Sequence, residues 1–235
     1  LSARPPCMQP LPQAPAPVPT FVRLLAEVLD AQAHQPPRAF YQALEQWLDW
    51  TRAVRLSRAL DAEVAAGAGV AAWRGEELRA ASERARLRLQ AHVAADEAWT
   101  GLAGSAVPDA GAAFAPLRQH YLGFQRALQA STGQLRGQLR ELLAQGSAAN
   151  VRLAELDAVM EAVLSPREVA LFGAVPELLA ARFAQLFSQE DPFDAARVAQ
   201  RAWWGFQREF RGVMLAELEV RFLPIDGLLA ALQSL

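Results

Sequence analysis

The chain has 235 residues, 52% of them hydrophobic and 20% charged, which is enough to bury a sizeable core in one or two domains. Its 23 basic residues, all arginine, nearly balance 25 acidic residues, and no third of the chain carries the basic excess typical of nucleic-acid binding. The single cysteine, Cys7, excludes an intramolecular disulfide, and we find neither an apolar run long enough to span a membrane nor a signal peptide.

Leu, Ala, Arg and Gln are abundant and β-branched residues are scarce, a composition that predicts an all-α protein. We expect a bundle of about seven or eight helices with long antiparallel, coiled-coil-like helix packing. Residues 1–19 contain seven prolines and are predicted to be a disordered Pro-rich leader. Residues 20–235 are predicted to form a single all-helical domain with a flexible loop near residues 99–112.

The first helices are predicted after Thr20 and after the "QPP" at 35–37. In the second, the apolar face that includes Trp47 favours a core helix, whereas Trp50 lies near the edge of that face. Arg55 and Arg58 continue the same face. Either the helix leaves the core or bends near residue 54, or these arginines pair with acids of another helix. Trp50, Arg55 and Arg58 together are a candidate interaction surface.

The middle of the chain starts with a small-residue linker, "AAGAGVAA" at 65–72, and a charged helix at 75–98 whose interleaved Glu and Arg predict a solvated surface. From residue 114 the apolar spacing indicates a long helix with a narrow seam, interrupted by a polar gap at Ser131 and Thr132. The seam consists of Phe114, Leu117, Tyr121, Phe124, Leu128, Leu135, Leu139 and Leu142.

The last part of the chain starts with a turn and helix cap at "GSAAN", residues 146–150. Ser165 and Pro166 are predicted to end one helix and start the next, because proline favours the first helical turn. Pro176 is predicted to break or kink the following segment. A long helix at about 193–222 is predicted to end at Pro224, before a short apolar helix.

No motif for catalysis, cofactor binding or metal binding emerges from these elements. His34, His92 and His120 lie on different predicted elements, without a second ligand at metal-site spacing. Asp157 and Glu161 share a helix face, but the Glu-x-x-His partner of carboxylate-bound metals is missing, so we interpret them, with Glu168, as an ordinary acidic face. Cys7, in the leader, is poorly placed for a nucleophile. We therefore expect no enzyme activity, no cofactor and no metal.

Four blocks of the sequence resemble a proteobacterial family of uncharacterised proteins, domain-of-unknown-function family 3348. The blocks are "FVRLLAEVLDA" with "QWLDWTRAVRLSRAL", "FAPLRQHYLGFQRALQ", "RLAELDAVMEAVLSPREVALFGAVPELLAARF" and "GVMLAELEVRFLPIDGLLAAL". The family has no established activity, so the resemblance implies no catalytic residue. It implies a soluble component of an envelope-associated assembly.

Long helices without catalytic motifs favour a non-enzymatic protein–protein interaction component in the bacterial cytoplasm. The expected partners are coiled-coil or envelope-associated proteins; a homo-oligomer stays open, and neither nucleic acid nor a membrane span is expected. Two alternatives remain. One is a small-ligand binder or an enzyme whose site is assembled from scattered residues, and the other is an arginine-based binder of nucleic acid or anionic lipid.

Overall fold

The computed structural model describes residues 21, 23–24, 50–61, 65, 67, 72–95, 99, 110–187 and 195–233. This part of the chain is all-α and contains no strand, so the predicted fold class is confirmed. Its helices are α3 (Trp50–Asp61), α4 (Ala72–Ala94), α5 (Ala110–Leu143), α6 (Ala148–Gly173), α7 (Val175–Phe187) and α8 (Ala195–Gln233). The described ranges therefore give six helices and do not support the predicted seven or eight. The leader and Trp47 lie outside them.

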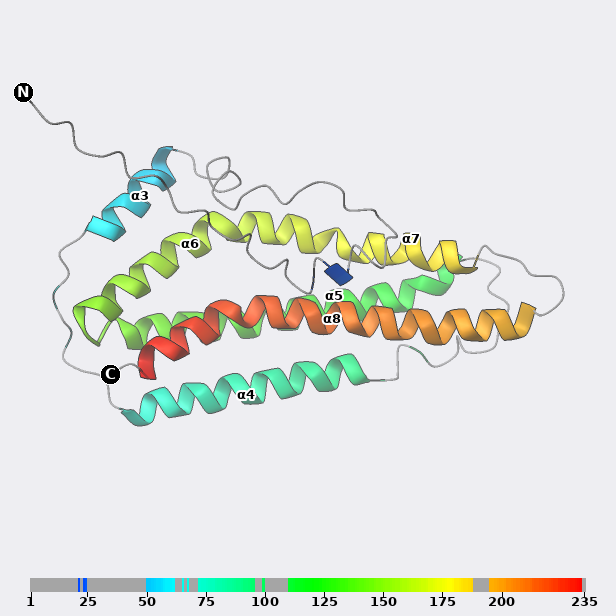
Figure 1. The fold of residues 1–235 in the computed structure, drawn as a ribbon, viewed down its shortest axis with the longest axis horizontal. Helices are drawn as coiled ribbons and strands as arrows, with labels where there is room; N and C mark the ends of the chain where they lie inside the picture. Colours follow the sequence, from blue (N-terminus) through cyan, green and yellow to red (C-terminus); the bar gives the residue numbers. More distant parts are fainter. Residues whose placement is uncertain are drawn as a thin grey trace, which may run out of the picture.

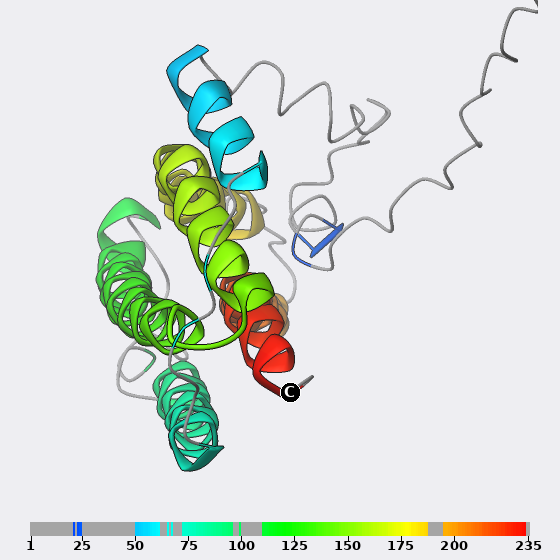
Figure 2. The ribbon, with the colours of Figure 1, turned by 90° about the vertical axis from the view of Figure 1, so that its left-hand side faces the viewer.

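The helices form an elongated bundle around α5 and α8, which run side by side in the same direction (Figure 1). The helices α4, α6 and α7 run the opposite way. The helix α4 packs against both α5 and α8 on one side, and α7 packs against both of them on the other side. The helix α6 packs against α5, and α3 lies on α6 at the outer edge (Figure 2).

The core lies along α5 and α8, where aromatic rings from both helices interlock. Tyr121 packs edge-on against Phe210 with ring centroids 5.4 Å apart, and Phe114 meets both Phe206 and Phe210. All eight residues of the predicted α5 seam are buried, so their place in the core is confirmed. One cluster of buried residues extends from Phe21 to Leu229.

Coiled-coil-like packing is not supported, because the buried faces are broader than a two-position seam. On α5 the neighbours Leu142 and Leu143 are both buried, and on α8 the neighbours Val213 and Met214 are both fully buried. A wide apolar face lets a helix contact several others at once, as α8 does with α4, α5 and α7.

Two predicted helix boundaries at prolines are wrong. The helix α6 continues through Pro166 and α8 continues through Pro224. Buried side chains flank each proline, such as Val163 before the first and Ile225 after the second, so tertiary packing offsets the missing backbone hydrogen bond. The boundary near Pro176 is confirmed, since Ala174 separates α6 from α7.

Two predictions for the α4–α5 region also need correction. The helix α5 begins at Ala110, inside the predicted loop, and Trp99 is a core residue that packs edge-on against Trp203 and Phe210. One face of α4 is buried rather than solvated, at Ser82, Ala85, Leu89 and Val93.

An arginine joins α4 to α8. Arg86 donates to Glu219 at 2.9 Å and to Asp226 at 2.5 Å, and its guanidinium lies 4.4 Å from the ring centroid of Phe222. Residues that are 133 and 140 positions apart in the sequence are thereby fixed together.

Candidate functional site

A cavity of about 250 Å³ lies where α5, α6 and α8 meet. We call it the α5–α6–α8 cavity. Its walls combine charged, hydroxyl and apolar side chains from all three helices. They are Gln129, Thr132, Gly133 and Arg136 of α5, Glu161, Ser165, Glu168, Val169 and Phe172 of α6, and Val220, Arg221 and Pro224 of α8.

A second hollow of about 360 Å³ lies between α4 and α5. Although it is larger, it is lined by solvent-exposed charges such as Arg74, Glu77 and Glu141. Exposed charges stay hydrated and provide little energy for recognition. The α5–α6–α8 cavity is the better candidate site because it borders charges that are withdrawn from water.

The α5 wall of the cavity corresponds to the polar gap in the apolar seam. Leu128 and Leu135 are buried on either side of the gap. Between them, the Thr132 hydroxyl donates to the Leu128 carbonyl at 2.9 Å, and Gly133 presents only backbone. A Cβ atom at Gly133 would meet nothing within 4 Å, so the space beside this exposed part of the wall is open.

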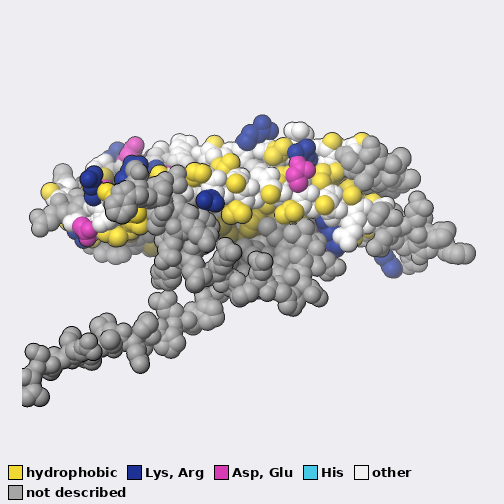
Figure 3. All heavy atoms as spheres, turned by 90° about the horizontal axis from the view of Figure 1, so that it is seen from above, with side chains coloured by type: hydrophobic (Ala, Val, Ile, Leu, Met, Phe, Trp, Pro, Cys, Tyr) yellow, Lys and Arg dark blue, Asp and Glu magenta, His cyan; other side chains and the backbone are white. Residues whose placement is uncertain are grey.

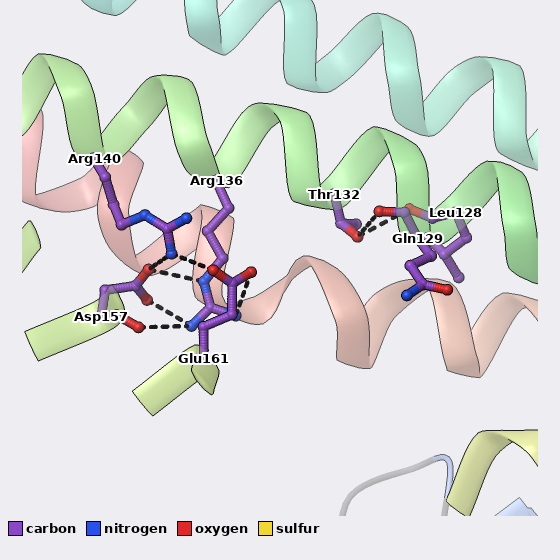
Figure 4. A network of polar contacts seen from close by, with 7 residues as sticks. All are labelled: Leu128, Gln129, Thr132, Arg136, Arg140, Asp157 and Glu161. Carbon is purple, nitrogen blue, oxygen red and sulfur yellow. Dashed lines mark hydrogen bonds and ion pairs between the residues drawn. The ribbon is translucent and has the colours of Figure 1, made fainter. Parts of the chain in front are cut away.

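Four charged residues form a network at one end of the cavity (Figure 4). Arg136 of α5 donates two hydrogen bonds to the carboxylate of Asp157 of α6, from Nε to Oδ2 at 2.8 Å and from Nη2 to Oδ1 at 2.7 Å. Arg140 donates to Asp157 at 3.2 Å and to Glu161 in a short contact. We call these four residues the α5–α6 quartet; its charges cancel.

The quartet is largely shielded from solvent, since the Arg136 and Asp157 side chains are 12% and 11% exposed. Burial alone would lower the pKa of Arg136, but the hydrogen bond and negative charge of Asp157, with the charges of Glu161 and Glu168, outweigh it and raise that pKa. The predicted acidic face is therefore not a solvated one: Asp157 and Glu161 neutralise arginines of the neighbouring helix.

A second polar cluster surrounds the fully buried Glu217 of α8, on the N-terminal side of the polar gap in α5. Its carboxylate accepts hydrogen bonds from the Tyr121 hydroxyl at 2.8 Å, Gln125 Nε2 at 3.0 Å and Arg221 Nε at 2.9 Å. Gln125 also donates to the carbonyl of Phe172 at 2.9 Å. The cluster thus joins α5 and α8 to the end of α6.

Burial sets the ionisation of this cluster. It raises the pKa of Glu217, against the opposing influence of Arg221 and of the hydrogen bonds that stabilise the carboxylate. Burial, together with the neighbouring charge of Glu217, also raises the pKa of Tyr121 well above its usual value. Tyr121 therefore stays a neutral hydrogen-bond donor at physiological pH.

A family model described as a protein of unknown function, DUF3348, matches residues 7–234, which is nearly the whole chain. The chain belongs to the DUF3348 family. No curated protein and no solved structure matches it.

In this DUF3348 member, the residues predicted as an interaction surface lie away from the cavity. Trp50 starts α3, but its side chain is outside the described part. Arg55 and Arg58 are exposed on α3, whose Ala59 is buried. An exposed position agrees with the expectation that the helix leaves the core there. In the described part of the chain, buried ion pairs are formed by arginines of other helices, such as Arg136 and Arg221.

The histidines give no metal site in the described residues. His92 of α4 and His120 of α5 stack with ring centroids 4.7 Å apart, a proximity that their sequence positions did not indicate. Within the described ranges, no group of three or more His, Cys, Asp or Glu side chains is arranged to hold a metal. His34 and Cys7 lie outside those ranges.

The sequence interpretation missed the cavity residues on α5 and α8. Two signals pointed to them: the polar gap at Ser131 and Thr132, and the placement of Glu217 and Arg221 within an apolar helix face. A charge in such a face usually has a partner in the fold.

One stretch, Ala148–Phe187, is long and apolar enough to cross a membrane by length and composition, with a mean hydropathy of 1.4 in its most apolar window. This stretch differs from the expectation that no apolar run is long enough to span a membrane. The stretch comprises α6 and α7, which Ala174 separates, and it contributes Phe172 and Phe183 to the core. Only 28% of its most apolar window is buried in the bundle.

Proposed function

We propose that this DUF3348 protein is a non-enzymatic helical component that acts by contact with a protein partner. The observation that carries the proposal is the incomplete burial of the apolar stretch formed by α6 and α7. Figure 3 shows hydrophobic side chains along the face that lies on the side of α6 and α7 in Figure 1. Contiguous apolar surface of this kind marks interaction sites in folded proteins.

Two large side chains near the end of α6 are exposed, on different sides of the helix. Val169 is 54% exposed and Leu171 is 66% exposed, and Ala170 and Ala174 beside them are exposed as well. Small and aliphatic residues on a helix surface let another helix approach closely. The partner we propose presents a helix with an apolar seam, as coiled-coil proteins do.

The charge distribution supports a protein partner over nucleic acid. Net charge is −2, and the described arginines include several that pair with acids of other helices, such as Arg86, Arg136 and Arg182. An arginine already paired with a carboxylate contributes little to a phosphate-binding surface. With the family resemblance, this favours a cytoplasmic component beside an envelope-associated bacterial assembly.

The test compares two leucines that are equally exposed on different helices. Leu171 on α6 is 66% exposed and Leu87 on α4 is 64% exposed. We expect Leu171→Lys to remove a co-purifying protein from affinity purifications in the native bacterium, whereas Leu87→Lys retains it. Both variants should unfold at the same denaturant concentration as the parent, because neither changes the core.

Quantitative mass spectrometry of the three purifications provides the measurement. The proposal fails if the same proteins are recovered with the parent, Leu171→Lys and Leu87→Lys. It also fails if the parent enriches no protein above an untagged control.

A further inference from the structure

We propose that the α5–α6–α8 cavity binds a small zwitterion, a molecule that joins a cationic amine to an anionic carboxylate through a short aliphatic part. The inference goes beyond the proposed contact function and does not depend on it, because it concerns a different kind of ligand and two charged residues, Arg221 and Glu168, that the contact face does not use; Val169 alone belongs to both surfaces.

The cavity has room for such a molecule. Its volume is about 250 Å³, and a water molecule occupies roughly 30 Å³ of the liquid, so the space exceeds what one or two bridging waters fill. Drug-sized ligands occupy pockets of roughly 300–1,000 Å³, and this cavity lies just below that range. A metabolite of amino-acid size fits it better.

Most charges around the cavity already have partners. Arg136 is held by both oxygens of Asp157, and Glu161 accepts from Arg140. Glu217, behind Arg221, accepts from three donors. These groups fix the walls and leave little capacity for a ligand.

Two opposite charges on the cavity walls, Arg221 and Glu168, have hydrogen-bonding capacity that no described residue fills. Arg221 donates from Nε to Glu217, but its Nη1 and Nη2 donate to no residue in the described part of the chain, although its side chain is only 11% exposed. Glu168, half-buried on α6, accepts no hydrogen bond and forms no ion pair there either, although its negative charge acts on Arg136 from beyond ion-pair distance. Withdrawn charges gain from a charged hydrogen-bonding partner.

The spacing of these two charges suits a single ligand that bears both complementary groups. The guanidinium of Arg221 lies 4.1 Å from the ring centroid of Phe172, which fixes it beside the last turn of α6. Glu168 precedes Phe172 by four residues, about 5–6 Å along the same helix face. A carboxylate bound by the fork of Arg221 thus lies one helical turn from an amine bound by Glu168.

Apolar side chains line the space between the two charges. The cavity lining includes Phe172 and Val169 of α6 and Val220 and Pro224 of α8. They favour an aliphatic link over a further polar group. Ser165 adds a hydroxyl that can accept from the amine, whereas the Thr132 proton is already donated to the chain.

The experiment measures the thermal midpoint, Tm, of the full chain with defined probes. We expect one or more of the L-α-amino acids, β-alanine and γ-aminobutyrate to raise Tm in proportion to the logarithm of ligand concentration. Butyrate and butylamine, which carry one charge each, should raise it much less. Isothermal titration calorimetry then gives the Kd of the best probe.

Two variants test the location. Gly133→Leu should fill the open space beside the wall and abolish the Tm shift, whereas Gly137→Leu should retain it, since Gly137 is an equally open position on α5 that does not line the cavity. Glu168→Gln should weaken binding of the zwitterion at least tenfold, with the Tm shift measured from the variant's own ligand-free Tm, because loss of the Glu168 charge near Arg136 lowers that Tm slightly.

The proposal is overturned if none of these zwitterions raises Tm at millimolar concentration, or if butyrate alone raises it as much as the best zwitterion. It is also overturned if Gly133→Leu still binds the best probe with the parent Kd. Should Gly133→Leu fail to fold, Glu168→Gln decides, and an unchanged Kd in that variant overturns the proposal.

Discussion

Replacing Asp157 by asparagine should destabilise the protein by about 2–4 kcal/mol. The Asp157 side chain is 11% exposed and accepts from Arg136 at 2.7 and 2.8 Å and from Arg140 at 3.2 Å. Removing one partner of a buried ion pair costs roughly 3–5 kcal/mol, because the other charge stays buried. Glu161 still lies 3.7 Å from Arg136 and compensates part of the loss, which lowers the expected value.

An exposed ion pair that also starts from α5 provides the control. Arg118 and Glu177 join α5 to α7, with side chains 49% and 60% exposed. Glu177→Gln should cost less than about 0.5 kcal/mol, because solvent screens such pairs. Urea denaturation of the parent and both variants, at low and high salt, gives the free energies of unfolding.

The double replacement Arg136→Met with Asp157→Leu separates the contribution of the ion pair from the contribution of side-chain packing. It should recover much of the stability that Asp157→Asn loses, because two apolar groups leave no unpaired buried charge. The reasoning is refuted if Asp157→Asn lies within about 0.5 kcal/mol of the parent, or if it costs no more than Glu177→Gln.

Glu217→Gln should remove a pH dependence of stability. Because burial raises the pKa of Glu217, the folded chain binds this proton more tightly than the unfolded chain, and the contribution to stability falls as pH rises from about 4.3 through the folded pKa. Denaturation at stepped pH should show this slope in the parent and not in the variant; identical slopes would contradict it. Phe210→Ala should cost about 3–5 kcal/mol, since the ring is fully buried against Trp99 and Tyr121. Trp204→Ala, at a position 59% exposed, should stay within about 0.5 kcal/mol in the same assay, and equal losses would show that the core is wrongly located.

Local periodicity was sufficient to predict that the chain is all-α and which face of α5 is buried, but not the number of helices. Residues three and four apart share a helix face whatever the rest of the chain does, so Tyr121, Leu128 and Leu135 could be assigned to the core from spacing alone. Proline rules failed at Pro166 and Pro224 because they consider the backbone only. In α8, the burial of Phe222 and Ile225 keeps the helix intact across its proline, and no local rule includes that contribution.

The candidate site could not be predicted because it consists of contacts between distant residues. Arg136 and Asp157 are 21 residues apart, and Tyr121 and Glu217 are 96 residues apart. Spacing within one helix shows that Asp157 and Glu161 share a helix face. It does not show which arginine of another helix pairs with Asp157. Each pairing depends on how the helices cross, which is decided by the whole core.

The central position of α8 determines when this protein can complete its core during synthesis. The rings of Phe114 and Tyr121 on α5 pack against Phe206 and Phe210 of α8, which are made later. At about 5–20 residues per second, the chain from the end of α5 at Leu143 to the end of α8 at Gln233 takes about 5–18 s to be translated, whereas a helix forms in about a microsecond. The apolar face of α5 therefore stays uncovered until α8 has been synthesised. The nascent chain is most prone to aggregation or chaperone binding in that interval.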